Sequence, residues 1–196
     1  MISPVLRRTL PPPPISRQEI LRYARSPEAG EETLLLLADV LEEAKEAFSY
    51  RVAFRPLPLF LSGDECRLGN VIWHSKSLSE ALAGCKEAVV FAASVGFEID
   101  RLITKYTRLS PAKALMLQAI GTERVEALCD AFCADLAREY GPLRSRFSPG
   151  YGDLPLLCQK DIFSLLDCPS TVGILLNESL LMSPSNSVTA IVGIQT

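Results

Sequence analysis

The stretch Ser187-Val188-Thr189-Ala190-Ile191-Val192-Gly193-Ile194 has an apolar side chain at every second position from Val188 to Ile194. Side chains two residues apart point to the same face of a β-strand, so this alternation predicts a strand with one face packed on a core. The apolar run at residues 88–93 predicts a second, buried strand. Both strands belong to the expected sheet.

The rest of the sequence predicts helices around that sheet. Ser16-x-x-Glu19 is a capping box that opens a helix ending near residue 25, and residues 31–48 have leucines at helical spacing. Further helices are expected at 77–84, 97–106 and 111–140 and after Pro155, with a bend or break of the long one at Gly121. A strand is also expected at residues 172–176, and two short strands are expected within residues 50–72. The predicted fold class is α+β, a mixed or antiparallel sheet flanked by helices.

Prolines restrict the predicted conformation in two parts of the chain. Pro56 and Pro58 favour an edge position for their strand, because proline cannot donate to a ladder. The run 11–14 favours polyproline II, so residues 1–15 are expected to form an N-terminal arm with a proline-rich spacer, either packed or loose. Residues 16–196 are expected to form a single domain.

Composition excludes several classes of function. The formal net charge of −3 and the pI of about 5.3 give no basic field of the kind that attracts nucleic acid. No apolar run reaches the ~20 residues of a membrane span and no secretory signal is present, which predicts a cytoplasmic protein with reduced, mostly buried thiols. Cys129 and Cys133 are expected to pack rather than bind metal, and His74 is expected to be structural.

The loop Arg146-Phe147-Ser148-Pro149-Gly150-Tyr151 has the residue types of a small-molecule site. The planar fork of Arg146 suits a carboxylate, and Gly150 allows a close approach of the backbone to a ligand. Pro149 restrains both itself and Ser148, which partly fixes the loop. Tyr151 is able to stack on an adenine or to face a sulfonium. The alternative is a surface turn whose arginine pairs with a nearby carboxylate.

This loop resembles the R-x-x-x-G-Y signature of the activation domain of cobalamin-dependent methionine synthase. The similarity continues through Pro155, Gln159 and the apolar face of residues 162–166 into Gly173-Ile174-x-Leu176-Asn177-Glu178-Ser179, then Met182, Pro184 and Ser187-Val188. Asn177 stands where the family has threonine. Upstream, Asp130 matches an acidic residue that faces the ligand in that family. The resemblance implies an S-adenosylmethionine site made by Arg146, Ser148, Pro149, Gly150, Tyr151, Glu178 and Asp130, without catalytic or metal-binding residues.

Two interpretations of Glu178 stay open, because its carboxylate could hold the ligand's ammonium or ribose or could accept backbone donors of the following turn. The resemblance also implies partners: a protein that carries cobalamin, and a flavodoxin-like electron donor. The sequence has no D-x-H-x-x-G corrinoid signature, so we expect a free-standing activation subunit that acts in trans on a methionine synthase.

The family's domains continue further after the strand that begins at Ser187. The pocket is therefore expected to be more open here, or completed by the partner or by a second copy of the chain. The alternatives are a binding module that senses S-adenosylmethionine or serves another corrinoid protein, and a scaffold with a decayed pocket. Interaction with nucleic acid or membrane is not expected.

Overall fold

The alternating stretch at the C-terminal end forms strand β8 (Ser187–Gln195) at one side of an antiparallel sheet. The structure is a computed structural model that describes residues 3–195. Within that range the sheet has six strands in the order β4-β3-β2-β5-β8, with β1 also paired to β2. The strands are β1 (Leu6–Thr9), β2 (Arg51–Ser62), β3 (Glu65–Leu68), β4 (Val71–His74), β5 (Cys85–Ser94) and β8. All of their registers are antiparallel, which resolves the alternative left open by the sequence.

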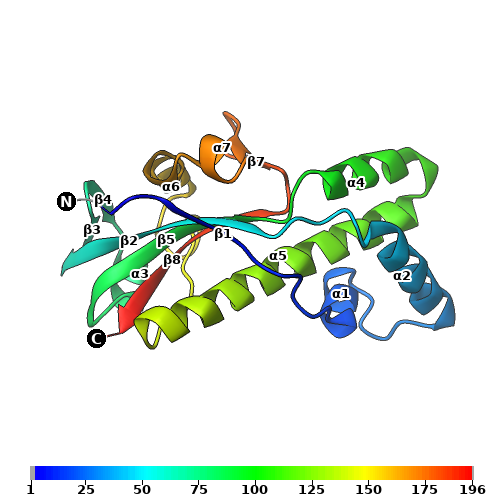
Figure 1. Cartoon of the computed structure of the whole chain (residues 1–196), viewed down its shortest axis with the longest axis horizontal. Coiled ribbons are helices and arrows are strands. Elements are labelled where there is room, and N and C mark those ends of the chain that lie inside the picture. Colours follow the sequence, from blue (N-terminus) through cyan, green and yellow to red (C-terminus); the bar gives the residue numbers. More distant parts are fainter. Residues whose placement is uncertain (1–2, 196) are drawn as a thin grey trace.

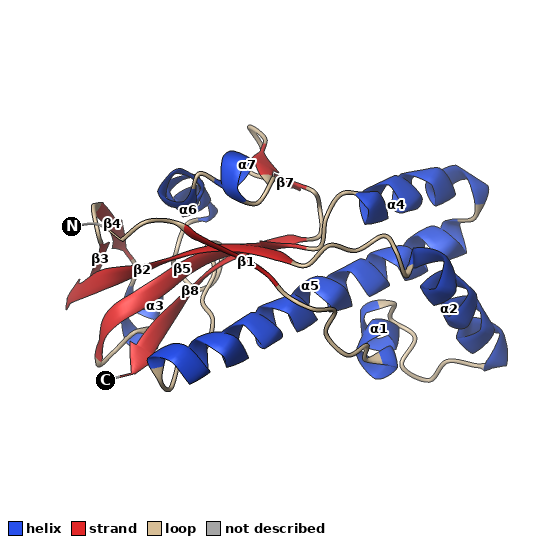
Figure 2. Ribbon diagram, viewed as in Figure 1, coloured by secondary structure: helices blue, strands red, loops and turns tan. Residues whose placement is uncertain are grey.

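Helices cover both faces of this sheet (Figures 1 and 2). The 30-residue helix α5 runs along one face, with α1, α2 and α4 around its N-terminal half, while α6 and α7 lie on the opposite side. The prediction of an α+β fold flanked by helices is confirmed. The helices are α1 (Arg17–Tyr23), α2 (Glu31–Ala44), α3 (Lys76–Ala81), α4 (Glu98–Leu109), α5 (Pro111–Tyr140), α6 (Gln159–Leu166) and α7 (Cys168–Thr171), with a 3₁₀ turn at Leu156–Cys158 and a hairpin of β6 (Leu175–Leu176) and β7 (Met182–Ser183).

Strand β8 is buried on both of its faces. Its alternate residues Ala190 and Val192 join the core under α5, as the pattern predicts, but Ile191 is buried in the second core, under α3 and α6. The prediction of a sheet with only one packed face is therefore wrong. The sequence alternates even though both faces are buried, because the second face has a polar residue, Thr189, and a glycine, Gly193, on either side of Ile191.

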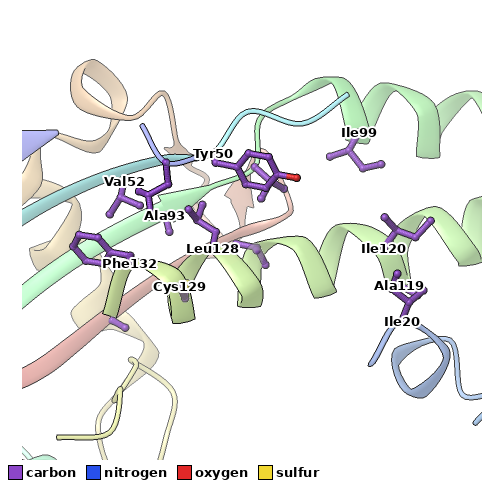
Figure 3. Close-up of a cluster of buried hydrophobic side chains, with 14 of the residues drawn as sticks. Ile20, Tyr50, Val52, Ala93, Ile99, Ala119, Ile120, Leu128, Cys129 and Phe132 are labelled. Carbon is purple, nitrogen blue, oxygen red and sulfur yellow. The ribbon is translucent and has the colours of Figure 1, made fainter. Parts of the chain in front are cut away.

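The core beneath α5 contains Phe132, Leu128 and Cys129 on the side of the helix that faces the sheet (Figure 3). Phe132 lies 5.1 Å, centroid to centroid, from Phe54 of β2 and the same distance from Phe91 of β5. Leu128 and Cys129, one turn earlier on α5, are fully buried in the same core. Large apolar side chains at this spacing fix the C-terminal half of α5 against the sheet.

Helix α5 passes through Gly121 without interruption, so the predicted bend or break is wrong. A Cβ added at Gly121 would lie 2.6 Å from the side-chain amide nitrogen of Asn186. The glycine is needed for close packing of the segment that leads into β8, and the surrounding helix tolerates its lower propensity.

Three other boundaries differ from the predictions. The N-cap of α3 is Ser75, whose hydroxyl accepts from Leu78 N at 3.0 Å, rather than Ser77. The strand predicted at 172–176 is limited to β6, and the predicted helix 31–48 ends at Ala44. Ser16 caps α1 as predicted, with its Oγ accepting from Glu19 N, but the capping box is incomplete because Ser16 N donates to Glu123 and not to Glu19.

The prolines of β2 occupy a local gap and not an outer edge. Strand β2 pairs with β5 over Arg51–Pro58, while β1 pairs with residues 51–54 and β3 with residues 59–62 of its other edge. Pro56 and Pro58 fall between the β1 and β3 registers, where a missing N–H interrupts no ladder. The edge-strand prediction is therefore wrong for the strand as a whole.

The described part of the predicted N-terminal arm packs against the remainder of the chain. Strand β1 pairs with β2, and Arg124 Nη1 and Nη2 donate to the carbonyl oxygens of Pro13 and Pro14 at 2.6 and 2.7 Å. Arg124 is buried and pairs with Glu123, which also accepts from Ser16 N. Residues 1 and 2 of that arm, and Thr196 at the end of the predicted domain, lie outside the described residues.

Candidate ligand-binding cleft

A cleft of about 620 Å³ opens beside the N-terminal end of β8. One wall is the segment from Arg146 to Asp153, here called the signature loop, and another is the hairpin of β6 and β7. Helices α5 and α6 contribute one residue each. The lining residues are Glu126, Arg146, Ser148, Pro149, Tyr151, Leu156, Gln159, Leu180, Leu181, Met182, Ser185, Ser187, Val188, Thr189 and Ala190.

The outer edge of β8 holds the start of the signature loop. Phe147 N donates to Ile191 O at 2.9 Å and Ile191 N donates back to Phe147 O at 2.8 Å. Arg144 N donates to Gly193 O at 2.8 Å in the same manner. The chain leaving α5 is thus tied to the sheet, and Arg146 is presented next to a fixed backbone.

Two glycines shape the turn of the loop. Gly150 has a φ of +91° and donates from its N–H to Leu154 O at 2.9 Å, and Gly152 has a φ of +53°. A Cβ on Gly152 would lie 2.5 Å from Ser77 Oγ, whereas one on Gly150 would meet Leu156 at an ordinary 3.5 Å. The positive φ values favour glycine at both positions, and the close approach to α3 requires it at Gly152.

Asp153 fixes the far end of the loop to the N-terminus of α3. Its carboxylate accepts from Ser75 Oγ at 2.5 Å, from Lys76 N at 2.9 Å and from Ser77 N at 3.1 Å. These hydrogen bonds, the one from Ser75 above all, lower the pKa of Asp153 to about 2. The loop is therefore anchored at one end to a strand edge and at the other end to a helix terminus.

Arg146 lies at the charged part of the cleft, with its side chain 26% exposed. Its Nη2 donates to Glu126 Oε2 and to Asp130 Oδ1, both at 2.9 Å. Its Nη1 is buried and has no hydrogen-bond partner among the described residues. The ion pairs have the geometry of the surface-turn alternative, but the orphaned Nη1 leaves part of the guanidinium fork unused, and such a donor is costly to bury.

The structure brings together four of the seven residues predicted for the site. Arg146, Ser148, Pro149 and Tyr151 line the cleft, and the side chain of Tyr151 stays 62% exposed at its mouth. The remaining three do not line the cleft. Gly150 shapes the turn without lining the cleft, Asp130 borders a neighbouring hollow on the other side of Arg146, and Glu178 is exposed on the turn between β6 and β7.

Sequence reasoning missed Glu126, which both lines the cleft and binds Arg146. Glu126 precedes Asp130 by four residues, and side chains at that spacing share a helix face. A search for acidic residues one turn from Asp130 would have found it. Gln159, Ser187 and Val188 appeared in the family resemblance, but no pattern indicated that their side chains meet at one cleft.

The six cysteines are free thiols, four of them buried. Burial raises the pKa of Cys133 to about 11 and that of Cys129 still further, so both are protonated at neutral pH. Between residues 3 and 195 no three His, Cys, Asp or Glu side chains are grouped as a metal site would need. Over the same residues no helix has the length and apolar character required to cross a membrane.

Comparison with known proteins gives a structural match without a sequence match. No family model matches the chain, and no curated protein is significantly similar to it. The crystal structure of the MetH reactivation domain bound to AdoHcy (S-adenosylhomocysteine) superposes with a TM-score of 0.69 over 99% of this chain and 80% of that one, at 17% sequence identity. The chain therefore has the fold of the MetH reactivation domain.

Proposed function

We propose that the chain binds S-adenosylmethionine in the cleft and supports the reductive methylation of a corrinoid carried by a separate methionine synthase. One observation carries the proposal: a chain with the fold of a reactivation domain bound to AdoHcy places the arginine and tyrosine of its R-x-x-x-G-Y motif on the wall of a cleft. At about 620 Å³, the cleft lies within the size range of small-molecule sites.

The charges around Arg146 suit this ligand. Arg146, Glu126 and Asp130 together carry a formal charge of −1. S-adenosylmethionine has a carboxylate, an ammonium and a sulfonium, so its formal charge is +1. We propose that its carboxylate takes over part of the Arg146 fork, and that the carboxylate released from Arg146 accepts from the ligand's ammonium.

After such an exchange the three side chains and the ligand together have a formal charge of zero. A ligand without the sulfonium charge, such as S-adenosylhomocysteine, gains less from the negative site, and its affinity is expected to be lower and less sensitive to salt.

The reaction needs positioning by this chain and no proton transfer. The partner's corrinoid, once reduced by one electron from a flavodoxin-like donor, supplies a cobalt nucleophile. The methyl carbon–sulfur bond breaks as the carbon–cobalt bond forms, and its electron pair stays on sulfur, which leaves as a neutral thioether. The cleft residues hold the sulfonium end toward the open mouth, where Tyr151 is exposed, and this accounts for the expected absence of a catalytic acid or base.

Calorimetry with S-adenosylmethionine and S-adenosylhomocysteine tests the ligand. We expect micromolar binding by the wild type and a loss of at least about 10- to 150-fold in Arg146→Ala, since hydrogen bonds to charged groups contribute about 1.5–3 kcal/mol. Arg144→Ala is the matched control, because Arg144 lies two residues away and donates to Ala83 O outside the cleft. Equal binding by Arg146→Ala, or none by the wild type, would contradict the proposal.

A reactivation assay tests the function itself. An oxidised, cobalamin-loaded methionine synthase without its own activation domain is mixed with this chain, S-adenosylmethionine and an electron donor. Faster return of activity with the wild type than with Arg146→Ala is expected. If the ligand binds and this synthase does not respond, the same assay with other corrinoid proteins separates the wider binding-module function from a sensor.

The Arg146 ion pairs favour one second candidate, a scaffold in which Glu126 and Asp130 hold a signature loop that binds nothing. Asp130→Asn distinguishes the two. In a scaffold this change only lowers stability, whereas in a binding site it changes the affinity for S-adenosylmethionine more than that for S-adenosylhomocysteine.

A further inference from the structure

Two buried polar side chains line the cleft away from its charged part. Gln159, the first residue of α6, is 4% exposed, and Thr189 of β8 is 3% exposed. Neither side chain has a hydrogen bond to any part of the chain that the structure describes. The amide and the hydroxyl are therefore left to hydrogen-bond with solvent or with a ligand.

The polar atoms of these two residues face the cleft. Arg146 Nη1 is the one side-chain nitrogen or oxygen between residues 3 and 195 that is both fully covered and without a partner. The amide of Gln159 and the hydroxyl of Thr189 therefore keep an accessible surface, and the cleft that both residues line supplies it.

The topology separates these groups from Arg146. Residues of β8 alternate between the two faces of the sheet: Ala190 faces the core under α5, and Thr189 with Ile191 faces the side of α6. Arg146 contacts Glu126 of α5, whereas Gln159 begins α6 on the opposite face. The cleft thus passes around the edge of β8, with an ion-pair cluster on one side and a neutral amide on the other.

A ligand whose carboxylate lies at Arg146 would place its other end on the α6 side. A carboxamide offers a donor and an acceptor side by side, which matches the amino group and adjacent ring nitrogen of adenine. Pro149, Leu156 and Met182 provide apolar surface for a flat ring near that amide. A ribose, which is polar on all sides, suits such surroundings less well.

We propose that Gln159 is a specificity-determining residue that reads the adenine edge of the ligand, with Thr189 offering a further hydrogen bond on the same side of the cleft. This inference rests on the proposed function, since it takes the ligand to be an S-adenosyl compound. It adds a contact with the base, whereas the signature loop provides the contact with the amino-acid end.

The test changes residue 159 and the 6-amino group of the ligand, separately and together, and compares the four dissociation constants. Calorimetry measures the dissociation constants of S-adenosylhomocysteine and of its analogue with hydrogen in place of the 6-amino group, for wild type and Gln159→Met. The wild type should prefer the amino compound by about tenfold, the discrimination expected of a good amide–adenine pair. In Gln159→Met that preference should disappear, and S-adenosylhomocysteine itself should bind about tenfold more weakly.

Two further variants secure the interpretation. Gln159→Glu keeps the shape and an acceptor but removes the donor, so it should weaken binding while keeping a preference for the amino compound. Gln118→Met, on the exposed side of α5, should behave as wild type. Thermal unfolding of each variant shows that it is folded.

The inference is overturned if Gln159→Met retains the wild-type preference, or if it loses discrimination against a 3′-deoxyribose analogue instead. Absence of binding by the wild type is a different result, because it removes the proposed function and not only the role of Gln159.

Discussion

The signature loop and the β6–β7 hairpin both line one cleft, yet they are held in place in different ways. The loop is hydrogen-bonded to β8 through Phe147 and to the N-terminus of α3 through Asp153. The turn of the hairpin is shaped by its own bonds, such as Leu181 N to Asn177 Oδ1 at 2.9 Å. Its base is tied to α4, where Ser185 donates to Asp100 from N and Oγ at 2.7 Å each.

This difference separates residues that need no rearrangement from one that does. Ser148, Pro149 and Tyr151 already line the cleft because their loop is anchored at both ends. Glu178 sits on the exposed hairpin turn and would contact a ligand only if that turn closed over it. The anchored wall needs no reordering, which would reduce the entropy lost in the ligand binding that we propose.

The largest expected effect comes from forcing the loop away from α3. Gly152→Ala adds a Cβ 2.5 Å from Ser77 Oγ in a positive-φ conformation, so we expect it to destabilise the protein by about 1–3 kcal/mol more than a change that adds strain alone. Gly63→Ala is that matched change, since Gly63 has a φ of +62°, close to that of Gly152, and open space around it. Chemical denaturation measures both, and calorimetry should show weaker ligand binding for Gly152→Ala only.

A second substitution checks the cause. Ser77→Gly removes the atoms that would collide, so the double variant should recover most of the difference between Gly152→Ala and Gly63→Ala. If Gly152→Ala and Gly63→Ala are equally stable, the close approach of the loop to α3 does not restrict Gly152.

The next largest effect is a pH dependence of the anchor. The pKa of Asp153 is lowered on folding, so its contribution to stability is complete above its ordinary value of about 4 and is lost as the pH falls toward about 2. Asp153→Asn should therefore be less stable than wild type at neutral pH, and the two proteins should converge between about pH 4 and pH 2. Denaturation at a series of pH values measures this, and a gap that persists at pH 2 would rule out the assigned cause.

The smallest effect should come from the opposite wall. Glu178→Gln is expected to change the affinity for S-adenosylmethionine by less than about twofold, because an exposed carboxylate outside the cleft contributes little in water. Glu126→Gln alters a residue that lines the cleft, so it should change the affinity for S-adenosylmethionine more than Glu178→Gln does. A loss of affinity in Glu178→Gln as large as that of Glu126→Gln would instead show that the hairpin closes over the ligand.

The fold was largely predictable because it depends on local patterns. The strands at 88–93 and 187–194 and the helix beginning at Pro111 were visible as apolar periodicity and caps. The errors fall where long-range packing overrides local preference. Gly121 is needed in α5 because Asn186, 65 positions later, packs where a Cβ would lie, and the prolines of β2 are tolerated because two different strands share one edge.

The loop of the candidate cleft could be predicted from the sequence, but the residues around that loop could not. Arg146 and Tyr151 belong to a continuous motif, whereas Glu126 and Gln159 reach the cleft from helices on opposite faces of the sheet. Their spacing in the sequence does not predict that both line one cleft, because this depends on the edge of β8 lying between the two helices. The ion pairs of Arg146 likewise follow from the position of α5 relative to the loop.

A crystal structure of the chain with S-adenosylhomocysteine tests the central claim most directly. We predict that the ligand occupies the cleft beside β8, with its carboxylate hydrogen-bonded to Arg146, which has given up Glu126 or Asp130, and its adenine edge at Gln159. An empty cleft at saturating ligand, with Arg146 still bonded to both Glu126 and Asp130, would contradict it.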